Sequence, residues 1–195
     1  MLIFWEQRLV FLATPKAGST AIEAALEPLA SVAITRPSEL KHTDVASWHA
    51  HVRPWLGARR GSEFTTVALM REPVDWLRSW YRFKLRDDVE DPGRAMHGVS
   101  FNDFARRYSQ PDGSGHLQIH SQAAFLCPPD QQVNRIFRYE DMPAFVEFLE
   151  DRLDCVIELP RLNVPPSVDV GLTPEAESDL RQAMSADLAL YHALG

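Results

Sequence analysis

An apolar segment near the amino end of the chain runs directly into a loop of small, charged and hydroxyl-bearing residues. Residues 9–20 read LVFLATPKAGST, so a strand predicted over 8–14 leads into a helix predicted from residue 18. The first N–H groups of a helix lack intrahelical acceptors and carry the positive end of the helix dipole. This junction therefore predicts a cradle for a phosphate or sulfate group.

The side chains of this loop favour the same interpretation. Gly18 lets the backbone approach an anion closely, Ser19 and Thr20 add hydroxyl donors, and Lys16 adds a mobile positive charge beside Ala17. In a Walker A loop the lysine follows the second glycine, whereas Lys16 precedes Gly18, which disfavours an ATP or GTP hydrolase. Taken alone, the loop is also compatible with an ordinary strand–turn–helix junction that carries a surface lysine.

A second strand-to-helix junction follows in residues 65–81, TTVALMREPVDWLRSWY. Arg71 stands at the predicted strand end, and Pro73 suits the first position of the predicted helix. Ser79 lies off the apolar stripe of that helix. Because a guanidinium fork matches the oxygens of a phosphate, Arg71 and Ser79 predict a second phosphate contact.

Together, residues 15–20 (PKAGST) and residues 71–73 (REP), with Ser79 eight positions after the arginine, resemble the two nucleotide-binding motifs of the sulfotransferase superfamily. The resemblance implies that the first motif holds the 5′-phosphosulfate of 3′-phosphoadenosine 5′-phosphosulfate (PAPS), and the second its 3′-phosphate. Residues 138–142 (RYEDM) and 160–163 (PRLN) resemble two further segments of the family. The similarity is nearest to the bacterial and carbohydrate-type branch. The glycine-rich carboxyl-terminal motif of the cytosolic branch is missing, so adenine contacts are not assigned.

Strands and helices are predicted to alternate along the chain, which indicates an α/β fold with a central parallel sheet flanked by helices in three layers. The resemblance implies a P-loop-like form of that fold, as one domain over 1–195. Polar segments 87–99 and 111–116 read as loops, either lids over a substrate or solvent-exposed connections. The predicted strands are 8–14, 31–35, 64–70 and 133–138, and the predicted helices are 18–29, 43–57, 73–86, 142–153 and 174–194.

The resemblance implies transfer of a sulfuryl group from PAPS to a hydroxyl or amine of an acceptor, with no metal required. By analogy with phosphoryl transfer, positioning and charge stabilisation supply most of the rate. Lys16 would stabilise the negative charge that grows on the leaving phosphate oxygen. The acceptor is expected to be a small molecule or a carbohydrate.

A base must also accept the acceptor's proton. His42 is the predicted base, because it follows the second predicted strand and titrates near neutrality, although a surface histidine is the alternative. Glu23 is the second candidate, one turn along the first helix; its other expected roles are to face solvent or to orient Lys16. His120 is a weaker candidate, as is His116, and Gln122 is a possible substrate contact.

Composition and charge disfavour a nucleic-acid binder, a metal-binding cysteine site and a disulfide-rich secreted protein. A net charge of −7 and a pI near 5.5 disfavour a nucleic-acid binder, while Lys16, Arg71 and Arg161 suffice for a local anion site. Cys127 and Cys155 show neither metal-ligand spacing nor a disulfide framework, which favours a reducing compartment. No apolar run reaches the length of a membrane span, so a soluble, cytoplasmic, bacterial enzyme is expected. Oligomeric state is left open.

Two other classes of function stay open on the sequence. One is a nucleotide kinase or phosphotransferase on a related P-loop fold, which would need magnesium and a lysine placed after glycine. The other is a non-catalytic nucleotide-binding protein that kept the fold and lost the chemistry.

Overall fold

The chain forms two units, each with a hydrophobic core of its own, in the computed structural model. The first unit contains Met1–Arg71 and Gln122–Leu162, and the second contains Glu72–Ser121 and Asn163–Ala193. The chain thus leaves the first unit after Arg71 and returns to it at Gln122. The single domain expected over 1–195 stays a prediction. The residues that the structure describes are 1–60, 63–86, 98–111, 117–160 and 168–194.

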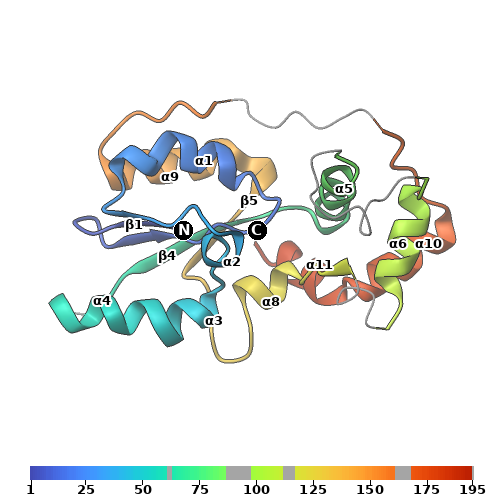
Figure 1. The fold of residues 1–195 in the computed structure, drawn as a ribbon, viewed down its shortest axis with the longest axis horizontal. Helices are drawn as coiled ribbons and strands as arrows, with labels where there is room; N and C mark the ends of the chain where they lie inside the picture. Colours follow the sequence, from blue (N-terminus) through green and yellow to red (C-terminus); the bar gives the residue numbers. More distant parts are fainter. Residues whose placement is uncertain (61–62, 87–97, 112–116, 161–167, 195) are drawn as a thin grey trace. The chain divides into compact units, whose positions relative to one another are not determined.

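The first unit is built on a mixed sheet with the strand order β3-β1-β2-β4-β5 (Figure 1). Strands β2 (Leu9–Phe11), β4 (Thr65–Met70) and β5 (Arg135–Arg138) run parallel, which confirms the predicted parallel centre. Strand β1 (Leu2–Phe4), which the sequence analysis missed, pairs antiparallel with β2. Strand β3 (Val32–Ala33) pairs antiparallel with β1.

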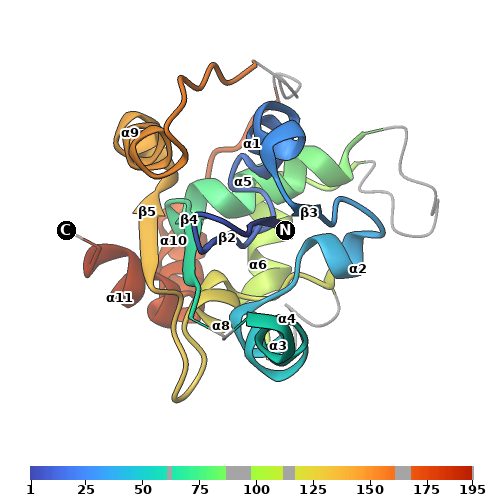
Figure 2. The ribbon, with the colours of Figure 1, turned by 90° about the vertical axis from the view of Figure 1, so that its left-hand side faces the viewer.

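Helices cover both faces of this sheet, as the burial of parallel strands requires. Helices α1 (Ser19–Leu26) and α9 (Met142–Leu153) pack on one face, and α3 (Val45–Ser47) and α4 (Arg53–Arg60) lie on the other (Figures 1 and 2). The predicted three layers are therefore present in this unit. Residues buried together beneath α1 and α9 are Leu2, Phe4, Leu9, Phe11, Ile22, Leu26, Val67, Leu69, Phe145 and Leu149.

The segment predicted as one helix over 43–57 is helical over most of that range, in three consecutive pieces. Helix α3 continues into a π-helical turn, η2 (Trp48–Val52), and then into α4. Asp44 starts α3 by accepting a hydrogen bond from the Ser47 N–H at 2.7 Å. Helix α2 (Ser38–Lys41) precedes this segment, and α8 (Gln122–Leu126) packs against α3. Single 3₁₀ turns are η1 (Glu27–Leu29) and η4 (Tyr139–Asp141).

The second unit is helical in its described residues. It contains α5 (Pro73–Lys84), α6 (Phe101–Ser109), α10 (Pro174–Ala183) and α11 (Ser185–His192). The helix predicted over 174–194 is divided because the backbone leaves the helical conformation after Ala183. The core of this unit contains Val74, Trp76, Leu77, Tyr81, Phe101, Phe104, Tyr108, Ile119, Leu180 and Met184.

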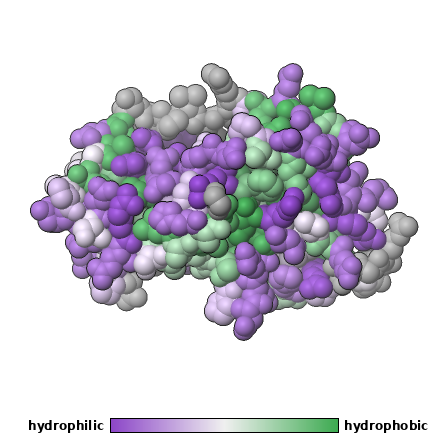
Figure 3. Space-filling view, turned by 180° about the vertical axis from the view of Figure 1, so that it is seen from behind, coloured by the Kyte–Doolittle hydropathy of each residue, from purple (hydrophilic) through white to green (hydrophobic). Residues whose placement is uncertain are grey.

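Hydrophilic side chains cover much of the face shown in Figure 3. Among the helices of the described residues, none has both the length and the apolar character needed to cross a bilayer. Cys127 and Cys155 are both free thiols. The segments predicted as lids or connections, 87–99 and 111–116, fall almost entirely outside the described residues.

Candidate active site

The loop between β2 and α1 has the backbone expected of an anion cradle. Lys16 and Gly18 both have left-handed backbone, with φ of 61° and 78°. Backbone turns of this kind orient successive N–H groups toward one side and form anion-binding concavities. At the start of α1, the Ala21 N–H donates to the carbonyl of Gly18, the N-cap residue, at 3.2 Å. The amides of Ser19 and Thr20 precede that of Ala21, so they are placed to meet a ligand.

One side chain of this loop carries a polar group that lacks a partner. Thr14 is only 1% exposed, and its hydroxyl makes no hydrogen bond within the described residues. Leaving a buried hydroxyl unsatisfied costs about 1–3 kcal/mol. An orphaned hydroxyl two positions before Lys16 fits a loop whose polar groups are completed by a ligand.

Arg71 lies beside this loop, within the same unit. Its Nη1 donates to the Lys16 carbonyl at 3.5 Å, and its guanidinium lies 4.7 Å from the centre of the Tyr139 ring. Strands β2 and β4 are parallel neighbours, so their carboxyl ends meet at one edge of the sheet. The structure thus brings together the two basic residues that the sequence predicted for one anionic ligand.

Tyr139 contacts both junctions at once. Its ring stacks on Arg71, and a β-carbon built on Gly18 would lie only 2.8 Å from the Tyr139 Cε2 atom. Glycine is required at position 18 for two reasons, the left-handed backbone and the approach of this ring. Only the first of them could be predicted from the sequence.

We expect Gly18→Ala to lower stability by about 1–2 kcal/mol through the left-handed backbone, and further by displacing the Tyr139 ring. Gly98→Ala is the matched control, because Gly98 has φ of 75° and nothing within 4 Å of an added β-carbon. Urea unfolding of both variants separates the two contributions. An equal loss of stability in both would show that the contact with Tyr139 carries no weight.

His42 lies against the same loop. Its Nδ1 donates to the Ala13 carbonyl at 2.6 Å, since a carbonyl can only accept, and Nε2 is then the atom that can receive a proton. Ala13 is three positions before Lys16, so their Cα atoms are at most roughly 11 Å apart. Burial lowers the pKa of His42, and the charge of Lys41 lowers it further, against the raising effects of the Ala13 bond and Glu23. The ring is therefore neutral at physiological pH.

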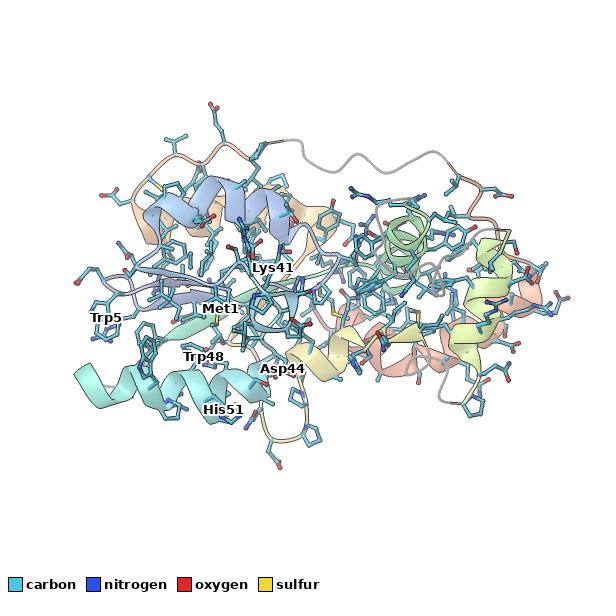
Figure 4. All side chains as sticks on the ribbon, viewed as in Figure 1. Met1, Trp5, Lys41, Asp44, Trp48 and His51 are labelled. Atoms are coloured by element: carbon cyan, nitrogen blue, oxygen red, sulfur yellow. The ribbon has the colours of Figure 1, made fainter. Side chains whose placement is uncertain are left out.

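Glu23 neither faces solvent nor pairs with Lys16, the two roles expected for it besides that of the base. It is 5% exposed rather than facing solvent, and its Oε2 lies 2.6 Å from the Lys41 ammonium. Its Oε1 lies 3.6 Å from the amino group of Met1, and Met1 and Lys41 are labelled together in Figure 4. Paired with Lys41, the Glu23 carboxylate anchors the residue that precedes His42. This arrangement favours His42 over Glu23 as the base.

Gln122 is also not placed as expected. It is 1% exposed, and its amide bonds the backbone of Arg71 instead of facing a substrate. Ser79 is half-buried on α5, within the second unit, where its predicted phosphate contact stays a prediction. Arg161 and His116 lie outside the described residues, and so do Leu162 and Asn163 of the 160–163 motif. Within the described residues, no three His, Cys, Asp or Glu side chains are grouped as metal ligands would be.

A cavity of about 260 Å³ occurs elsewhere in the first unit. Phe64 and Asn134 line it immediately before β4 and β5 begin, so it lies at the opposite ends of these strands from Lys16 and Arg71. The side chains that complete its lining are Trp48, His49, Arg53 and Glu63. The cavity is therefore separate from the candidate active site.

Comparison with models of known protein families gives a match over most of the chain. The model of a family described as the sulfotransferase family matches residues 1–187. The matched range includes both strand-to-helix junctions and His42. No curated protein matches the chain.

Proposed function

The chain belongs to the sulfotransferase family, and on that premise we propose that it transfers a sulfuryl group from PAPS to an acceptor. The acceptor is a hydroxyl or amine on a small molecule or carbohydrate, and the other product is adenosine 3′,5′-bisphosphate. We also expect a cytoplasmic location, in keeping with the free thiols of Cys127 and Cys155.

The observation that carries this proposal is the contact between the two junctions. The Arg71 guanidinium reaches the Lys16 carbonyl at 3.5 Å, so a side chain of a type that binds phosphate with two N–H groups lies beside a loop suited to a second anion. A donor with phosphate groups at both its 3′ and 5′ positions needs two such neighbouring anion sites. A single junction would suit any phosphate.

In the proposed site, residues 16–20 hold the phosphosulfate, through Lys16 and through the hydroxyls and backbone amides of Ser19 and Thr20. Arg71 holds the 3′-phosphate, and Ser79 is expected to join it. No metal is proposed, because Lys16 and the start of α1 supply the positive charge that the leaving group needs.

The chemical step requires one proton transfer and one group transfer. The acceptor oxygen or nitrogen forms a bond to sulfur, and the bond between sulfur and the bridging oxygen of the donor breaks. The acceptor proton moves to Nε2 of His42, and the electron pair of the broken bond stays on the phosphate oxygen, where Lys16 stabilises it.

Calorimetric titration tests the donor assignment. We expect adenosine 3′,5′-bisphosphate to bind at least roughly tenfold more tightly than adenosine 5′-monophosphate, because one charge-assisted phosphate contact contributes about 1.5–3 kcal/mol. Arg71→Ala should remove this preference. Binding of ATP with magnesium in preference to the bisphosphate would instead favour a kinase or phosphotransferase.

Binding of the bisphosphate without transfer to any acceptor would favour the non-catalytic alternative. The acceptor is identified by incubating the protein with ³⁵S-labelled donor and a panel of carbohydrate and small-molecule acceptors. If no carbohydrate and no small molecule of the panel becomes labelled, the proposed acceptor class is refuted.

A further inference from the structure

Arg71 is held at its backbone by a side chain that lies 51 positions further along the chain. The Oε1 atom of Gln122 accepts from the Arg71 N–H at 2.9 Å, and its Nε2 donates to the Arg71 carbonyl at 2.8 Å. Both bonds are short enough to be strong, and Gln122 is almost fully buried. One amide therefore satisfies both polar backbone groups of one residue.

This pair of bonds begins where the strand ladder ends. The pairing of β4 with β5 stops at Met70, opposite Arg138. Arg71 comes next, and its N–H and carbonyl bond the side-chain amide of Gln122. The two bonds restrain the backbone of Arg71 at the point where its side chain is needed.

The geometry points to Gln122 as a positioning residue for Arg71, a role that rests on the proposed function. A guanidinium lies at the far end of a long side chain, so a small backbone rotation displaces it by roughly 1 Å, enough to weaken a bidentate phosphate contact severely. Gln122 fixes the backbone and Tyr139 holds the guanidinium. Gln122 itself is buried behind Arg71 and acts through it.

The same strand offers a matched control. Asn134 accepts from the Thr66 N–H and the Thr66 hydroxyl, each at 2.8 Å, near the amino end of β4. Both amides thus hold the backbone of β4, one near each end. Only Gln122 does so beside the candidate active site.

The test measures the affinity of adenosine 3′,5′-bisphosphate by calorimetry in the intact chain. We expect Gln122→Met to weaken binding by roughly three- to tenfold, and Asn134→Leu to change it less than about twofold. Thermal melting of both variants shows whether they are folded. If Gln122→Met does not fold, Gln122→Glu takes its place, because a protonated carboxyl keeps one acceptor and one donor.

Burial disfavours the charged form of a carboxyl at position 122 and so raises its pKa. For Gln122→Glu, the affinity relative to the unsubstituted protein at the same pH should therefore recover as the pH falls toward 5 and the carboxyl becomes protonated. A ratio that does not change with pH would contradict a role for the two hydrogen bonds.

A double-mutant cycle with Arg71→Ala decides how Gln122 acts. If it acts through Arg71, Gln122→Met will have almost no effect on binding once Arg71 is alanine. An equal loss in both backgrounds, or an equal loss in Asn134→Leu, would overturn the inference. Failure of the unsubstituted protein to bind the bisphosphate is a different outcome: it refutes the proposed function, and this role with it.

Discussion

Replacing Lys16 with methionine is expected to reduce the rate of sulfuryl transfer by roughly 10²–10³-fold, as the loss of one preorganised oxyanion donor does in other enzymes. Methionine keeps an unbranched side chain of similar length and removes the charge. The charge on the leaving phosphate oxygen is largest in the transition state, so the loss should fall more on kcat than on the affinity for the bisphosphate.

The left-handed backbone of Lys16 is the same in the variant, so the experiment measures the side chain alone. Its φ of 61° strains any residue that has a β-carbon, so Lys16→Met keeps that strain and changes only the side chain. Lys84→Met, on α5, removes a positive charge from the second unit and serves as the control for net charge. Lys16→Arg should retain part of the activity. Unchanged kcat in Lys16→Met would exclude Lys16 from the chemical step.

Local sequence patterns were sufficient to predict the two junctions and the centre of the sheet. Both junctions combine an apolar strand, a glycine or proline and a helix start, and each of these signals lies within about twelve residues. Lys16 and Arg71 were found in this way, and the parallel order of β2 and β4 then places them together. Their roles toward a donor stay predictions.

Residues whose position depends on remote contacts could not be predicted. Glu23 lies off the apolar stripe of its helix and was expected in solvent, but it is buried because Lys41 and Met1 approach it from another part of the chain. Gln122 is similar, because an amide that bonds the backbone of Arg71 has no local sequence signal. Burial of a charged or polar group depends on partners that spacing does not reveal.

Strand β1 was missed although a signal for it exists. Residues 2–4 are apolar and are separated from β2 by the polar stretch 6–8, an arrangement typical of a hairpin. The division into two units gave no such signal. The second unit combines residues 72–121 with residues 163–193, and contacts between segments so far apart in the chain have no local sequence signal.

Replacing His42 with asparagine is expected to leave bisphosphate binding within about twofold and to reduce transfer by roughly 10²–10⁴-fold, the usual contribution of a general base. The asparagine amide can still donate to the Ala13 carbonyl, the acceptor that His42 uses at 2.6 Å. The variant therefore removes the proton acceptor and keeps a donor toward the loop. His42→Ala, which removes both, should bind equally well and be no more active.

The pH dependence supplies an independent readout. Because burial lowers the pKa of His42, the ring is neutral and able to accept a proton across the neutral range. The value of kcat/KM for the acceptor should therefore stay level above pH 6.5, the ordinary pKa of histidine, and fall as the pH drops below it and the ring becomes protonated. In His42→Asn, the residual kcat/KM should no longer fall as the pH drops below 6.5.

His49 is the matched control for His42. Burial also lowers its pKa, together with the charge of Arg53, and its Nδ1 lies 3.2 Å from that guanidinium. It lines the cavity at the other end of the strands, so His49→Asn removes a similar imidazole from the same unit without touching the loop. Full activity in His42→Asn, or an equal loss in His49→Asn, would mean that the proton leaves the acceptor by another route, because the base assignment depends on the contact of the His42 imidazole with the loop that carries Lys16.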